Sequence, residues 1–332
     1  MPQDGIRRLA RRNGELAMTL MRLKSFIALA VALILSSATS ALAQIDLSGT
    51  WALRNYIDAL DTAPGSGTLP VDYLGLPLNE AGRAAALAVD PSSVSAPERI
   101  CNPYSPVYLA EGPFGIQLSN ETDPINGTTV AWKISGWDDL APITIWMDGR
   151  PRPSQNALHE LGGFTTGVWE NDVLVTYTTH MKMGVLRRNY TPHSDQATMR
   201  MRFARHGDLL TLTVRVEDPV YLDGPYYMSR VFQLTAGAPQ TSVGRPCTVA
   251  FEGVRAGVVR HFLPGQNPFI DEMTRLYNLP REAVLGGPET MYPEYRKKLR
   301  GSYMIPEKCL TPNVREGILG CGGPGTYPRI PR

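Results

Sequence analysis

The sequence predicts a mainly β protein, built as an antiparallel barrel with a helical, loop-rich C-terminal cover. From residue 128 onward the chain carries short runs rich in β-branched and aromatic residues, separated by turn-forming residues. Glycine (31) and proline (28) are spread along the chain rather than gathered in one linker, which is typical of many short elements joined by turns. Successive strands at this spacing favour a meander that curls into a barrel. The predicted strands are residues 129–135, 143–147, 173–179, 198–204, 209–217 and 226–234.

The clearest hairpin is predicted over residues 198–217. Met199, Met201 and Phe203 alternate with arginines in its first strand, and residues 210–216 alternate in the same way in the second. Only a turn of even length puts both apolar sets on one side of the sheet. The opposite face, which includes Arg202, is expected to meet solvent. If the barrel interior is polar instead, this face would line it and Arg202 would bind a ligand.

The first 43 residues are expected to be removed from the mature protein. Arg22 and Lys24 precede an apolar run that ends at Ala41-Leu42-Ala43, as in a secretory signal peptide cleaved after Ala43. The run is shorter than the roughly 20 residues that a membrane-spanning helix needs. We therefore expect a periplasmic protein without a membrane span after cleavage, and an uncleaved anchor is the alternative.

The rest of the chain is predicted to have three parts. Residues 44–127 form an extended segment with one helix at 78–90, which Asn79 can cap. Residues 128–240 form the barrel, and residues 241–332 form the cover, in which a helix follows Asn267-Pro268.

The charge balance argues against nucleic-acid binding. The chain has 33 basic and 31 acidic residues, and residues 1–43 hold six of the former and two of the latter, so the mature chain carries a net charge of −2. A nucleic-acid site would need a basic face.

The four cysteines predict disulfides in an oxidising compartment, with free thiols as the alternative. Cys309 and Cys321 lie close together in the tail, so a local loop is the simplest pairing and leaves Cys101 with Cys247. Three connectivities remain possible.

Seven motifs resemble, in the same order, a large and mostly uncharacterised family of exported bacterial proteins with GxWExDxLVV and PHSxA segments. They are DLSGTWA (46–52), LPLNEAGRAAA (76–86), PERICNP (97–103), IWMDGRPRP (145–153), GVWENDVLV (167–175), PHSDQATMRMRF (192–203) and VRVEDP (214–219). The resemblance implies a lipocalin-like, calycin-type barrel, a fold that usually encloses a small apolar ligand. The family commonly has a histidine where this chain has Phe164, and His159 and His193 are the nearest substitutes in sequence.

Four residues are candidates for acid/base catalysis. His193 has a carboxylate two residues on, at Asp195, and such a pair can exchange protons. Glu170 would act as a general acid or base if it pointed into a dry interior, and Asp148 follows a predicted strand where a barrel mouth would lie. Alternation along the chain places Glu170 and Asp172 on the face of Leu174. The structural alternative is that Glu170 and Asp148 belong to sheet corners and turns.

Four further residues are candidates for ligand binding. Arg150 could pair with a carboxylate or enolate, Trp146 and Trp169 offer large apolar surfaces, and Arg202 could orient a ligand. The alternatives are a solvated arginine in an Asp-Gly turn and a tryptophan that plugs one barrel end.

The predicted function is an exported protein with a small-molecule site in its barrel. The site would bind a small, largely apolar or aromatic compound, or perform cofactor-free hydratase, isomerase or lyase chemistry on it. The alternative is a non-catalytic periplasmic ligand-binding or envelope structural protein. Walker, HExxH and CxxCH motifs are missing from the sequence, so no cofactor and no metal is expected. The catalytic hypothesis requires His193 to face inward together with Asp148, Glu170 or Asp195.

Overall fold

The computed structural model describes residues 45–54, 71, 73, 75–89, 104–110, 115–136, 142–187, 189–236 and 261–299. The chain divides into two compact units, Met1–Ile45 and Asp46–Arg332, and the fold described below is that of the second. The predicted signal peptide, its cleavage site and all four cysteines lie outside the described residues.

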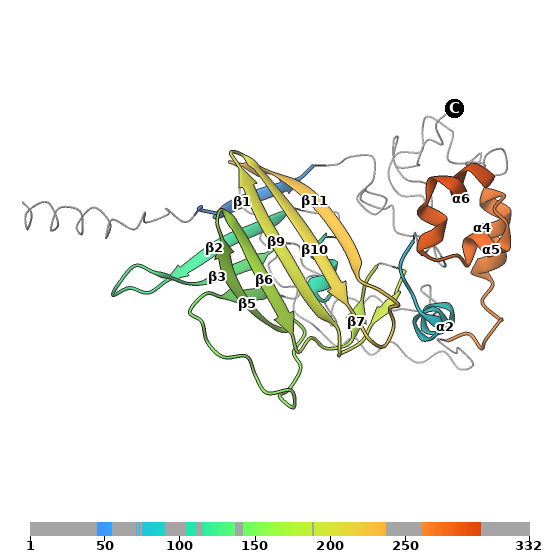
Figure 1. The fold of residues 1–332 in the computed structure, drawn as a ribbon, viewed down its shortest axis with the longest axis horizontal. Coiled ribbons are helices and arrows are strands. Elements are labelled where there is room, and N and C mark those ends of the chain that lie inside the picture. The colour runs from blue at the N-terminus through green and yellow to red at the C-terminus, as the bar shows by residue number, and fades with distance from the viewer. Residues whose placement is uncertain are drawn as a thin grey trace, which may run out of the picture. The chain divides into compact units, whose positions relative to one another are not determined.

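Nine strands of the described chain form a closed barrel (Figure 1), which confirms the predicted fold class. Its order is β1-β11-β10-β9-β6-β5-β4-β3-β2, and β1 closes the ring by pairing antiparallel with both β11 and β2. The strands are β1 (Gly49–Leu53), β2 (Ile116–Thr122), β3 (Thr129–Ser135), β4 (Ile143–Trp146), β5 (Phe164–Glu170), β6 (Val173–Thr179), β9 (Thr198–His206), β10 (Leu209–Glu217) and β11 (Tyr226–Thr235). Two short strands, β7 (Gly184–Val185) and β8 (Pro192–His193), pair separately.

The barrel contains one strand beyond residue 128 that was not predicted, β5, and it differs from the predicted meander in two further respects. First, β1 and β2 belong to the segment that was expected to precede the barrel, so the barrel starts at Gly49 rather than near residue 128. Second, β4 and β5 run parallel. The long connection over residues 147–163 explains the parallel pair, because a chain can return to the starting end of a strand only through an extended crossover.

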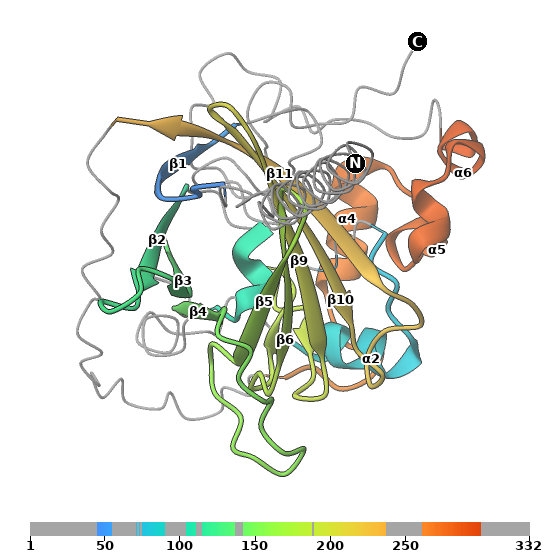
Figure 2. The same ribbon diagram turned by 60° about the vertical axis from the view of Figure 1, so that its left-hand side comes forward.

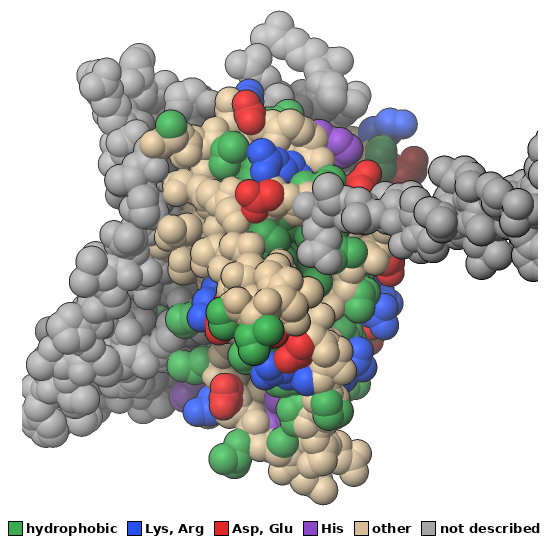
Figure 3. Space-filling view, turned by 90° about the vertical axis from the view of Figure 1, so that its left-hand side faces the viewer, with side chains coloured by type: hydrophobic (Ala, Val, Ile, Leu, Met, Phe, Trp, Pro, Cys, Tyr) green, Lys and Arg blue, Asp and Glu red, His purple; other side chains and the backbone are tan. Residues whose placement is uncertain are grey.

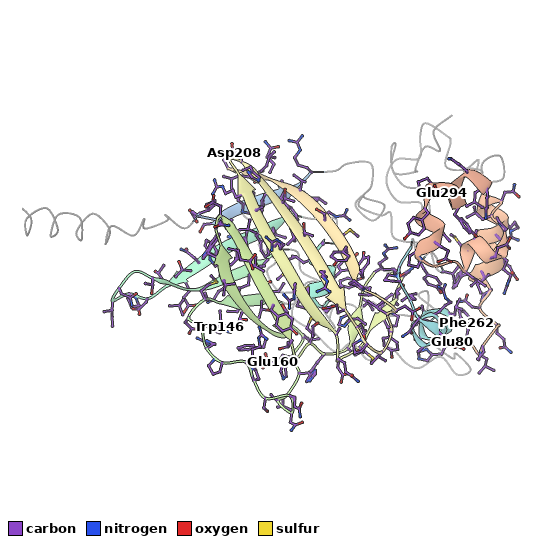
Figure 4. All side chains as sticks on the ribbon, in the orientation of Figure 1. Glu80, Trp146, Glu160, Asp208, Phe262 and Glu294 are labelled. Atoms are coloured by element: carbon purple, nitrogen blue, oxygen red, sulfur yellow. The ribbon has the colours of Figure 1, made fainter. Side chains whose placement is uncertain are left out.

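Alternation within each strand separates the interior from the outer surface. The predicted β9–β10 hairpin is confirmed: His206 pairs with Leu209 across a two-residue turn, in which Gly207 has φ 59°. Its apolar set is at most 1% exposed and faces inward; the members are Met199, Met201, Phe203, Leu210, Leu212, Val214 and Val216. The turn, marked by Asp208, and the loop that holds Glu160 lie at opposite ends of these strands (Figure 4).

Trp51 stabilises the seam at which the barrel closes. It is fully buried, and it pairs with Leu234 of β11 on one side and Ile116 of β2 on the other. Its indole Nε1 donates to the Leu47 carbonyl at 2.9 Å, and the guanidinium of Arg205 lies 5.3 Å above its ring. The apolar surface and the one polar atom of this side chain are thus both satisfied.

A short 3-10 helix, η2 (Pro106–Ala110), fills part of the space that the strands enclose. All five of its residues are buried, and it packs against β10 and β11. Figure 2 shows it between β2–β4 and β9–β10. The interior is therefore partly occupied by the chain itself.

The predicted helix at 78–90 is confirmed as α2 (Glu80–Ala88). Asn79 caps it by accepting from the Gly82 amide at 2.8 Å, and its side-chain amide donates to the Val220 carbonyl at 2.9 Å. The backbone amide of Asn79 also donates to the Tyr221 carbonyl at 3.0 Å. The two bonds to Val220 and Tyr221 attach α2 to the loop between β10 and β11.

The C-terminal segment is helical, as predicted, and hydrogen bonds tie it to α2. It contains α4 (Phe269–Tyr277), α5 (Arg281–Val284), η3 (Pro288–Met291) and α6 (Pro293–Lys298). The Phe262 amide donates to the Ala88 carbonyl at 2.7 Å, and Asn267 Nδ2 donates to the Leu87 carbonyl at 2.8 Å. Over the described ranges, no helix is both long enough and apolar enough to cross a bilayer.

Replacing Gly82 with alanine tests how closely α2 docks. Alanine normally gains about 1 kcal/mol over glycine inside a helix. Here a Cβ would lie 2.3 Å from the Tyr221 carbonyl oxygen, so we expect a net loss of about 1–3 kcal/mol in the free energy of unfolding. Urea unfolding would measure it, with the exposed Ala84→Gly as the control for propensity alone. A gain in stability for Gly82→Ala would contradict the docking.

Candidate functional site

His193 lies at the centre of a closed hydrogen-bonded cluster. It is fully buried on β8; its Nε2 lies 2.7 Å from Ser105 Oγ and its Nδ1 lies 2.9 Å from the Ser194 carbonyl oxygen. A carbonyl can only accept, so Nδ1 carries the proton and Nε2 accepts from the Ser105 hydroxyl. Burial lowers the pKa of His193, although the Ser194 carbonyl and Asp218 oppose this shift. The imidazole is therefore a neutral acceptor.

Asp218 holds the backbone beside this histidine. The Ser194 amide donates to Asp218 Oδ2 at 2.6 Å, and the Ser194 hydroxyl donates to Oδ1 at 2.7 Å. On the other side of the imidazole, a Cβ added to Gly184 would lie only 2.6 Å from Nε2. The cluster therefore joins β7, β8 and the end of β10 and leaves no room for a substrate.

The other three predicted catalytic residues do not join His193, so the predicted acid/base cluster is wrong. Asp195 is exposed in the turn after β8. Glu170 pairs with Arg202 at 3.0 Å, and both side chains are 52% exposed. Asp148 is also exposed and forms an ion pair with Arg150 at 2.6 Å.

The turn between β5 and β6 explains why Glu170 points outward. Asn171 adopts φ 54°, so that Glu170 pairs with Val173 and Trp169 pairs with Leu174 across a two-residue turn. Cross-strand partners share a face, and Leu174 is fully buried. Trp169 therefore faces inward, and the expectation that Glu170 shares the face of Leu174 was wrong because alternation does not continue through a tight turn.

Trp146, Arg150 and Asp148 form a corner on the outer surface. Ile145 is fully buried, so Trp146, the next residue, points to the other side of the wall. The guanidinium of Arg150 lies 3.4 Å from the Trp146 ring centroid. The side-chain hydrogen bond from Arg150 is the main cause that lowers the pKa of Asp148. As with Arg202, the geometry does not support a ligand role inside the barrel for Trp146 or Arg150.

The interior holds polar groups that the predicted site did not include. One row of cross-strand partners runs around the wall; its members are Trp169, Leu174, Phe203, Leu212 and Arg230. Arg230 is only 2% exposed. The inward position of Arg230 could be predicted from the sequence, since alternation in β11 puts it on the face of Tyr226 and Phe232.

Four inward-facing polar atoms have no hydrogen-bond partner in the described part of the chain. They are Trp132 Nε1, Trp169 Nε1, Thr176 Oγ1 and Arg230 Nε. Trp132 pairs with the buried Ile145, and Thr176 pairs with Met201, so both belong to the inner face. Of the predicted ligand-binding residues, Trp169 is the one that lies on this face.

The comparisons add no homologue: no family model, no curated protein and no solved structure matches this chain. Among the residues that the structure describes, no group of three or more histidine, cysteine or acidic side chains could hold a metal ion. On the face that Figure 3 draws, basic and acidic side chains are interspersed.

The depressed pKa of His193 makes stability depend on pH. Its pKa lies below the ordinary 6.5 in the folded protein, so the unfolded chain binds more protons as the pH falls below that value. The stability present above pH 6.5 is therefore lost progressively as the pH falls toward the folded-state pKa. Urea unfolding between pH 7.5 and 5.5 should show a smaller loss in His193→Gln than in the unmodified protein. The exposed His206→Gln is the control, and an equal loss in all three proteins would refute this assignment.

Proposed function

We propose that this is an exported protein whose barrel binds a small, largely apolar molecule in its interior without a cofactor. The observation that carries the proposal is the set of four unpartnered polar atoms on the inner wall. A buried donor without a partner costs about 1–3 kcal/mol, and native proteins contain few of them. Several on the inner face of one barrel favour a guest that forms hydrogen bonds with them.

The rest of the inner wall suits an apolar guest. Phe203, Leu174, Leu212 and Val214 surround the polar atoms and are at most 1% exposed. Small-molecule sites are mostly apolar, with a few polar groups that fix the orientation of the ligand. This composition favours a compound with a hydrocarbon body and one polar end.

Export is supported by the sequence of the leader. A basic start, an apolar run and Ala41-Leu42-Ala43 follow each other as in a secretory signal peptide. The motif resemblance to exported bacterial proteins supports the same compartment, the periplasm.

Binding is favoured over catalysis by the state of the titratable groups. His193 is enclosed by Ser105, Ser194 and Gly184, and the acidic candidates Glu170 and Asp148 lie on the outside in ion pairs. A general acid or base must reach the proton that it transfers. The interior offers donors and apolar surface, which are the requirements of a binding site.

Titration with the neutral fluorescent probe N-phenyl-1-naphthylamine tests this proposal. We expect saturable binding to the unmodified protein, because the probe is apolar and of ligand size. Met228 faces the interior opposite Val214, so Met228→Trp should fill the site and weaken binding at least tenfold. Tyr227→Trp is the matched control, since Tyr227 is the next residue on β11 and is 58% exposed on the outer face.

Two results would overturn the proposal. One is the lack of saturable binding to the unmodified protein, and the other is an equal effect of both tryptophan variants. Either result would favour a structural protein with a filled barrel. The buried helix η2 already occupies part of the interior. Far-UV circular dichroism would confirm that each variant is folded.

A further inference from the structure

Arg230 occupies an unusual position for a charged residue. It lies in the middle of β11 and pairs with Leu212 of β10, which in turn pairs with Phe203 of β9. Both partners are fully buried, and Arg230 itself is 2% exposed, whereas Ser229 beside it is exposed. The guanidinium is therefore directed to the apolar interior.

The charge of this side chain is uncompensated in the described part of the chain. A guanidinium keeps its charge at physiological pH, and burying an unpaired charge is among the most costly events in folding. Its Nε has no hydrogen-bond partner. The acidic residue next to Trp169 in the same row of the wall, Glu170, lies on the outer face and pairs with Arg202.

We propose that Arg230 binds the carboxylate of a small aliphatic or aromatic monocarboxylic acid, whose apolar body lies against Phe203 and Leu212. This inference rests on the proposed function and names its ligand class. One carboxylate balances one guanidinium, and its two oxygens match the paired N–H groups of arginine. A phosphate dianion would leave a net negative charge in the same apolar surroundings.

Two of the three remaining unpartnered donors fit the same ligand class. Trp169 Nε1 lies four strands away around the ring of nine, on the far side of the interior from Arg230. Thr176 lies one inward step along β6 from Leu174. Both donate hydrogen bonds, so a ligand with an additional carbonyl or hydroxyl oxygen would satisfy them as well. A fully apolar ligand would leave the guanidinium charge unbalanced.

Competition between decanoate and decan-1-ol tests this assignment, because the two share a ten-carbon chain and differ in charge. Each would displace N-phenyl-1-naphthylamine from the full-length secreted protein after bound lipid has been removed. We expect decanoate to bind at least tenfold more tightly than decan-1-ol. Arg230→Met should weaken decanoate at least 30-fold and change decan-1-ol less than threefold. Arg230→Lys keeps the charge and should retain the preference for decanoate.

Arg202→Met is the matched control, because it removes an arginine from the outer face of the same barrel and should leave both affinities unchanged. If decanoate and decan-1-ol compete equally and Arg230→Met affects neither selectively, the anion site is refuted while the interior binding site stands. If the fluorescent probe itself does not bind the unmodified protein, the proposed function fails first.

The stability of the ligand-free protein gives an independent measure. Replacing an unpaired buried charge with methionine should leave the melting temperature unchanged or raise it. A drop of 5 °C or more on Arg230→Met would mean that Arg230 already has a partner in the folded chain, and this too would overturn the proposal.

Discussion

The closure of the barrel by β1 is the constraint on which the rest of the structure depends. Because β1 pairs with both β11 and β2, every strand of the barrel has two neighbours and each side chain of the wall points either inward or outward. Trp51 secures this seam from the inside through its bond to Leu47 and its contact with Arg205. Once the ring is closed, strand register alone decides which polar groups are removed from water.

Much of the fold could be predicted because alternation is a local property. The inward sets of β9 and β10, the even turn at Gly207 and the cap of α2 at Asn79 each depend on a few neighbouring residues. The parallel β4–β5 pair could not be predicted, since it depends on how a long loop crosses the barrel. Likewise, the pairing of β1 could not be predicted, because β1 is short and its partners β2 and β11 are distant from it in sequence.

The residues of the candidate site were harder to predict than the fold. His193 is a candidate in the sequence because its side chain titrates, yet both of its ring nitrogens are hydrogen-bonded, to Ser105 and Ser194. Sequence spacing cannot reveal these partners. Glu170 was assigned to the wrong face because a two-residue turn at Asn171 resets the alternation. The sequence does not single out Arg230 as a site residue, because one arginine in a strand resembles an ordinary solvated residue. Alternation in β11 nevertheless predicts that it faces inward. The burial of its guanidinium depends on the closed barrel that surrounds it.

The most direct test of the account is a crystal structure of the protein with decanoate bound. The account predicts density for the fatty acid inside the barrel, with its carboxylate within hydrogen-bonding distance of the Arg230 guanidinium and its chain against Phe203. An interior filled by protein side chains, or an Arg230 already paired with a carboxylate of the chain itself, would contradict it.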